Sequence, residues 1–135
     1  MPDEPAAFDL SSTFVHLGAG PTAVPVPDFR WTPDFLGAYH RAFEADGDAG
    51  RLVSLLDQER SWPAWERHPA GEELVVAVSG RYELIVELGI ERHRLALEPG
   101  WAYVNPRGAW HTLDVLEPGR ALFVTPGRGT EVRPR

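Results

Sequence analysis

The stretch WERHPAGEELVVAVSG, residues 65–80, limits the possible folds of this chain most strongly. Glu66 and His68 are two positions apart, so their side chains share one face of an extended strand. The Pro-Ala-Gly sequence at 69–71 then breaks the strand and favours a turn. An aliphatic run that opens with Glu73 follows this turn and ends at a glycine. The pattern predicts a β-hairpin that gathers Glu66, His68 and Glu73 on one face.

A second stretch, EPGWAYVNPRGAWH at residues 98–111, has a similar order of turns, apolar strand and histidine. A Pro-Gly turn leads into a short apolar strand, a Pro-Arg-Gly turn follows it, and His111 closes the stretch. Similar short apolar runs fill most of the chain from Arg51 onward, and turns rich in glycine and proline separate them. With 13 glycines and 13 prolines in 135 residues, this pattern predicts an all-β sandwich or barrel.

Both stretches resemble the sequence motifs of the cupin superfamily. The first cupin motif is G-x5-H-x-H-x(3,4)-E-x6-G, and the chain fits its end from His68 through Glu73 to the closing glycine. The second is G-x5-P-x-G-x2-H-x3-N, which the chain fits from Gly100 to His111, with valine in place of the last asparagine. In the first motif, Glu66 replaces the first histidine, and an arginine replaces the leading glycine. The resemblance implies a small single-domain cupin, with a jelly-roll or double-stranded β-helix barrel.

The resemblance also implies a metal site. His68, Glu73 and His111 occupy the ligand positions of cupins, and Glu66 occupies a fourth position with a changed side chain. Imidazole and carboxylate ligands without sulfur suit a divalent first-row metal, with iron, manganese or zinc expected before nickel or copper. Glu66 is in addition a candidate catalytic base. The alternative is that these residues line a polar cavity that binds no metal.

The same alternation predicts residues around the site. Trp62 and Ala77 should face inward with the ligands, and we expect them, together with Trp110, to contact a substrate. Tyr103 is a candidate proton donor. For the aromatic residues the alternative interpretation is burial in the core or at its rim.

The N-terminal part contains the one convincing helix pattern. A capping threonine, a proline at the first position and an apolar stripe at helical spacing predict a helix near residues 33–46, packed on the outside of the barrel. Residues 12–50 should form a strand-and-helix extension of a single domain that covers 1–135. Residues 1–11 and 127–135 are polar or rich in glycine and proline, and are predicted to be loose tails.

Composition restricts the expected partners. The formal net charge of −7 argues against binding to nucleic acid. No apolar run reaches membrane-spanning length, and residues 1–10 lack the basic start of a signal peptide. The absence of cysteine fits a reducing compartment, so we expect a cytoplasmic protein. The expected partner is a small molecule. Unpaired sandwich edges favour a homodimer, with the proline-bearing segment 23–27 crossing its interface.

Three classes of function stay open, because a fold alone does not select a reaction. The first is a metal-dependent enzyme that acts on a small polar organic molecule, as a dioxygenase, isomerase or cyclase. The second is a module that binds or senses a small ligand without catalysis. The third is a degenerate cupin kept as part of an assembly.

Overall fold

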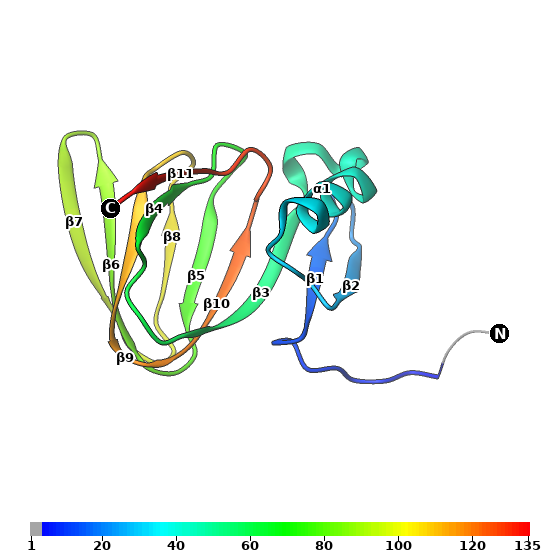
Figure 1. Cartoon of the computed structure of the whole chain (residues 1–135), viewed down its shortest axis with the longest axis horizontal. Coiled ribbons are helices and arrows are strands. Elements are labelled where there is room, and N and C mark those ends of the chain that lie inside the picture. The colour runs from blue at the N-terminus through cyan, green and yellow to red at the C-terminus, as the bar shows by residue number, and fades with distance from the viewer. Residues whose placement is uncertain (1–3) are drawn as a thin grey trace.

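The structure is a computed structural model that describes residues 4–135. Antiparallel strands are the main secondary structure of this part of the chain (Figure 1). In chain order the strands are β1 (Thr13–Leu17), β2 (Ala23–Pro27), β3 (Arg51–Gln58), β4 (Ala64–Arg67), β5 (Glu73–Ala77), β6 (Arg81–Leu88), β7 (Glu91–Leu97), β8 (Ala102–Asn105), β9 (His111–Glu117), β10 (Gly119–Thr125) and β11 (Glu131–Pro134). A helix, α1 (Pro33–Ala42), and a 3-10 helix, η1 (Glu44–Ala49), lie between β2 and β3.

The strands form two sheets. The six-stranded sheet has the order β2-β1-β3-β10-β5-β8, and the five-stranded sheet has the order β11-β4-β9-β6-β7. Every strand pair is antiparallel. The predicted all-β sandwich with one short N-terminal helix is therefore confirmed.

The main core lies between the two sheets. Along β5 every second residue is buried, as expected for a strand with one face on the core. Val75, Ala77 and Phe123 come from the six-stranded sheet, and they pack with Leu84 and Leu113 from the five-stranded sheet. This packing fixes which face of each strand points inward, and the inward faces carry the candidate site.

The helix lies outside the barrel, but it is shorter than predicted and covers a different surface. It ends at Ala42 rather than near residue 46, and it packs on the β1–β2 hairpin beside the barrel (Figure 1). Its apolar stripe meets an aromatic cluster, in which the ring of Phe29 lies 4.8 Å from Phe35 and 5.4 Å from Tyr39. The stripe thus covers a small core that belongs to the N-terminal extension, because these aromatic side chains supply a nearer apolar surface than the barrel.

A buried histidine ties this extension together. The Nδ1 atom of His16 lies 2.5 Å from the Tyr39 hydroxyl, and its Nε2 lies 2.7 Å from an Asp46 carboxylate oxygen. Its ring also stacks on Phe43 at 3.8 Å. These contacts join β1 to both helical segments, so His16 has a structural role.

The C-terminal segment corrects a second prediction. Residues 127–135 were predicted to be a loose tail, but β11 pairs with β4 from Glu131↔Arg67 to Pro134↔Ala64. The strand forms because β4 would otherwise present an unpaired edge at this position. Residues 4–9 are exposed and contain no strand, and residues 1–3 of the predicted N-terminal tail lie outside the described part. Within residues 4–135, no helix has the length and apolar character that membrane crossing requires.

Candidate metal centre

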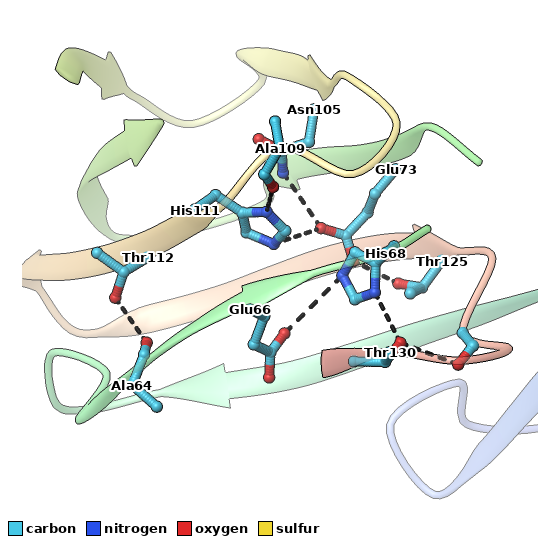
Figure 2. Close-up of polar contacts among 11 residues, drawn as sticks. Ala64, Glu66, His68, Glu73, Asn105, Ala109, His111, Thr112, Thr125 and Thr130 are labelled. Atoms are coloured by element: carbon cyan, nitrogen blue, oxygen red, sulfur yellow. Dashed lines mark hydrogen bonds and ion pairs between the residues drawn. The ribbon is translucent and has the colours of Figure 1, made fainter. Parts of the chain in front are cut away.

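Three strands bring the predicted ligands together between the sheets (Figure 2). Glu66 lies on β4, and His68 follows directly after that strand ends. His111 opens β9 and is the direct cross-strand partner of Glu66. Glu73 opens β5, which belongs to the opposite sheet.

This arrangement corrects the predicted hairpin. β4 and β5 do not pair with each other, and the turn at 69–71 instead carries the chain from one sheet to the other. The predicted gathering of Glu66, His68 and Glu73 still occurs, because the two inward faces meet across the core.

The two histidines point their Nε2 atoms at one carboxylate. The Nε2 of His68 lies 3.2 Å from Oε2 of Glu73, and the Nε2 of His111 lies 3.2 Å from Oε1 of the same group. Glu66 is slightly farther away, with Oε2 3.9 Å from Nε2 of His68. One possible ligand atom from each of Glu66, His68 and His111 lies within 4.8 Å of the others. Glu66, His68 and His111 can therefore hold a metal ion, and Glu73 lies within reach of the same point.

Hydrogen bonds assign the same tautomer to both histidines. Nδ1–H of His111 donates to the carbonyl oxygen of Ala109 at 3.1 Å. The hydroxyl of Thr130 donates to the carbonyl of Gly127 at 2.9 Å, so it accepts from Nδ1–H of His68 at 2.8 Å. In neutral rings this leaves each Nε2 with a lone pair directed into the site.

The surroundings of these two Nε2 atoms indicate whether a metal ion fits the site. Both are buried, and neither makes a hydrogen bond, although each lies close to the Glu73 carboxylate. Two imidazole lone pairs beside a carboxylate repel one another unless a proton or a metal cation lies between them. Nitrogen and oxygen donors without sulfur suit a divalent first-row metal. The residues present therefore fit such an ion.

Glu73 remains ionised at the centre of the site. Burial by itself would raise the pKa of its carboxyl, but the interactions with His111 and His68 outweigh burial and hold the pKa below its usual value. Two neutral donors also stabilise the charge, the Thr125 hydroxyl at 2.6 Å and the Asn105 amide at 3.2 Å. In return, the charge of Glu73 raises the pKa of His111 despite the burial of that ring.

Glu66 lies at the open side of the site. Its side chain is 37% exposed, whereas those of the other three residues are buried. Burial of the carboxyl and the nearby charge of Glu73 raise the pKa of Glu66, although His68 and His111 act in the opposite direction. A carboxylate of raised pKa beside the opening is well placed to take up a proton from a molecule that enters there.

The predicted pocket residues lie in different places. Trp62 packs against the inner core with its ring 6.3 Å from that of His111, and its indole N–H donates to Gln58 at 2.8 Å. Tyr103 also packs against this core. Ala77 is fully buried within it. The roles of Trp62 and Tyr103 toward a substrate stay predictions.

Trp110 does not lie in the barrel. It precedes His111 by one residue, and two guanidinium groups on the outer face lie over its ring, that of Arg67 at 4.7 Å and that of Arg133 at 4.5 Å from the ring centre. Because neighbouring strand residues point to opposite faces, an inward His111 requires an outward Trp110. The expected contact of Trp110 with a substrate inside the barrel does not fit this placement.

Three residues around the ligands were missed by the sequence analysis, namely Asn105, Thr125 and Thr130. Asn105 could have been found, because it stands two residues after Tyr103 on the same face of β8. No local sequence pattern marks Thr125 or Thr130 as a site residue. The pairing of β10 with β5 brings Thr125 to the site, and the C-terminal segment that leads into β11 brings Thr130.

We predict that Thr130→Ala lowers metal affinity while the protein remains folded. The substitution removes the acceptor that holds His68 in its tautomer, and loss of such an outer contact costs roughly 10–100-fold in affinity. Competition titration with a chromogenic chelator measures the change. Thr130→Ser is the matched control, because it keeps the hydroxyl, and it should bind as the wild type does. Equal affinities for all three proteins would contradict this role.

Comparisons with known proteins identify structural neighbours. No protein-family model and no curated protein matches the chain. Among solved structures it is similar to hydroquinone 1,2-dioxygenase PnpCD in complex with Cd²⁺ and 4-hydroxybenzonitrile, with 18% identity over 56% of each chain and a TM-score of 0.47. It is also similar to Fe(II)-HppE with (S)-1-HPP, with 14% identity over 56% of this chain and 42% of that one, and a TM-score of 0.48.

A third similar structure is a cupin superfamily protein from Desulfitobacterium hafniense DCB-2, with 16% identity over 56% of this chain and 65% of that one, and a TM-score of 0.48. At least two of the similar structures are cupin proteins, this one and a cupin-2 domain containing protein from Shewanella frigidimarina NCIMB 400. This is the superfamily whose motifs the sequence resembles. The matched region spans 42% to 65% of the length of the first three of these proteins. The activities named above are those of the similar proteins and are not assigned to this chain.

Proposed function

We propose that this protein binds one divalent first-row metal ion and acts with it on a small polar organic molecule. His68, Glu73 and His111 are the core ligands, and Glu66 is a fourth ligand or a base. The observation that carries this proposal is the pair of buried Nε2 atoms that face the Glu73 carboxylate without a hydrogen bond. Iron, manganese and zinc suit this donor set best, because two carboxylates make it harder than an all-imidazole site.

In this proposal the residues of the site either orient the metal ligands or transfer a proton. A bound metal ion supplies a Lewis acid that polarises an oxygen atom of the substrate. Thr130 and the Ala109 carbonyl orient the two imidazoles, and Thr125 and Asn105 orient Glu73. Glu66, which is partly exposed, accepts a proton from the substrate at the open side and can return it after the reaction.

Metal analysis tests the proposal directly. Protein purified without a histidine tag should contain about one metal ion per chain, or should take one up when incubated with iron(II), manganese, zinc, nickel or copper salts. If the protein stays free of metal after each incubation, the result would contradict the proposed function. If metal binds but oxygen uptake and product formation are absent across a panel of metabolites, the site belongs to a ligand-binding module instead.

We predict that metal affinity falls as the pH is lowered. A proton competes with the metal for each Nε2, because only neutral imidazole is a ligand. The charge of Glu73 raises the pKa of His111, so this competition should begin above the ordinary histidine value of 6.5. Below that pKa, affinity should fall about tenfold per pH unit for each proton displaced. Isothermal titration at several pH values measures the slope, and a flat profile would contradict imidazole ligation.

A further inference from the structure

The outer face of the five-stranded sheet carries a cross-strand row that begins and ends with arginine. The strand pairing sets out this row, from β11 through β4, β9 and β6 to β7, as Arg133, Trp65, Thr112, Ile85 and Arg94. The three central side chains are buried, although they point away from the core between the sheets. Side chains on the outer face must therefore cover them.

Arginine side chains provide this cover. The guanidinium of Arg92 lies 4.9 Å and that of Arg133 lies 5.2 Å from the centre of the Trp65 ring. The two arginines come from β7 and β11, the strands at opposite edges of the sheet. Their side chains are 61% and 35% exposed. A dissolved ligand can therefore reach both guanidinium groups without displacement of a strand.

A cleft of about 530 Å³ lies between the arginines of the two edges. Its lining combines arginines from both edges with two apolar residues of the sheet, namely Arg92, Arg94, Arg133, Arg135, Trp65 and Ile85. Sites for small molecules typically have volumes of about 300–1,000 Å³, so the cleft is large enough for one. We refer to it as the arginine cleft.

One carboxylate bridges the two edges. Oε1 of Glu87 lies 3.2 Å from Nη2 of Arg92 and 2.5 Å from Nη2 of Arg133. The two guanidinium groups can therefore contact the same small anionic group. Each of them carries five N–H donors, and the one shared oxygen cannot satisfy the donors of both. The bridge shows the geometry of anion recognition and leaves donors for a ligand.

The second bridge has the same form. Asp114 pairs with Arg94 at 3.9 Å and with Arg135 at 2.5 Å, and Arg94 also pairs with Glu83 at 2.6 Å. Within residues 4–135, the four arginines of the cleft thus outnumber the three carboxylates that pair with them. The chain as a whole has a formal net charge of −7. An excess of positive charge in the cleft of an acidic protein favours an anionic ligand.

We propose that the arginine cleft binds the diphosphate or triphosphate group of a small molecule. Guanidinium groups match carboxylate and phosphate oxygens equally well in geometry. A ligand must, however, compete with Glu87 and Asp114, which the chain holds in place at high effective concentration. A single carboxylate offers no more charge than these residues do. A polyphosphate carries several charges on adjacent groups, so it can contact arginines of both edges at once.

The arginine cleft is separate from the candidate metal centre. Trp65 and Thr112 alternate with Glu66 and His111 along β4 and β9, and residues that alternate along a strand point to opposite faces of the sheet. The metal ligands face the inside of the sandwich, and the cleft opens on its outside. The proposal therefore does not depend on metal binding.

Isothermal titration with sodium pyrophosphate, in buffer free of divalent cations, tests the proposal. The protein should bind one pyrophosphate per chain, roughly tenfold or more tightly than phosphate or citrate. Arg92→Gln and Arg133→Gln should each weaken binding by roughly tenfold, because each removes a charged hydrogen-bond donor. The matched control is Arg120→Gln, which changes an arginine that is 45% exposed on the other sheet and should bind as the wild type does.

Two further variants cover the case in which loss of an arginine disturbs the fold. Glu87→Gln keeps the size of the side chain and removes the competing charge, so it should tighten pyrophosphate binding by roughly tenfold. A role of Glu87 in folding alone would give no such gain. His111→Ala alters the candidate metal centre and should leave pyrophosphate binding unchanged.

These titrations can each overturn the proposal. It fails if pyrophosphate does not bind, if citrate binds equally well, or if Arg120→Gln lowers affinity as much as Arg133→Gln does. It also fails if Glu87→Gln binds no more tightly than the wild type. Loss of binding in His111→Ala would place the anion at the candidate metal centre instead. Tighter binding of ADP than of pyrophosphate would support the proposal and indicate a nucleotide as the source of the phosphate groups.

Discussion

Replacing His111 with alanine should abolish metal binding. His111 supplies one of the two buried imidazole nitrogens and is the cross-strand partner of Glu66, so its removal leaves His68 as the one imidazole among the proposed ligands. The loss should exceed the roughly 10–100-fold effect of an outer contact, and should leave no measurable metal after gel filtration. Metal analysis of the purified variant, with circular dichroism to check its fold, measures the result.

Two further variants make this result specific. His93→Ala removes an exposed histidine on β7 and should retain the wild-type metal content. Glu66→His restores the histidine pair of the cupin motif and should keep or tighten binding, because imidazole replaces a ligand at the same position. Unchanged metal content in His111→Ala would show that the ion, if present, binds elsewhere.

Replacing Phe123 with alanine should destabilise the fold more than any surface change. Phe123 is buried on the inward face of β10, and its ring lies 6.0 Å from that of Trp62. Truncation of a buried phenylalanine costs about 3–5 kcal/mol, through lost apolar burial and the cavity that remains. That is a large share of the about 5–15 kcal/mol by which a domain is stable.

Urea denaturation at a fixed protein concentration measures this change, and the fixed concentration keeps any dimer contribution constant. Ile90→Ala is the control, because Ile90 is fully exposed in the turn between β6 and β7 and its loss should change stability by no more than about 0.5 kcal/mol. A Phe123→Ala variant as stable as Ile90→Ala would mean that the core is not packed as described here.

The sequence by itself determined the all-β character of the chain and the inward residues of the candidate site. Turn residues and an aliphatic run predicted a strand that opens with Glu73, which is β5, and the two motifs predicted that His68, Glu73 and His111 meet. Such signals are readable because they are local. A turn depends on adjacent residues, and the face of a strand on whether positions are odd or even.

Only the tertiary structure decided which strands became partners. It separated β4 from β5 into opposite sheets and paired β11 with β4. It also brought Thr125 and Thr130 to the ligands and placed the helix on the β1–β2 hairpin. Local pattern leaves these choices open, because any strand with an apolar face can pair with several others. Long-range packing selects among them, since only one arrangement buries the inward faces of both sheets together.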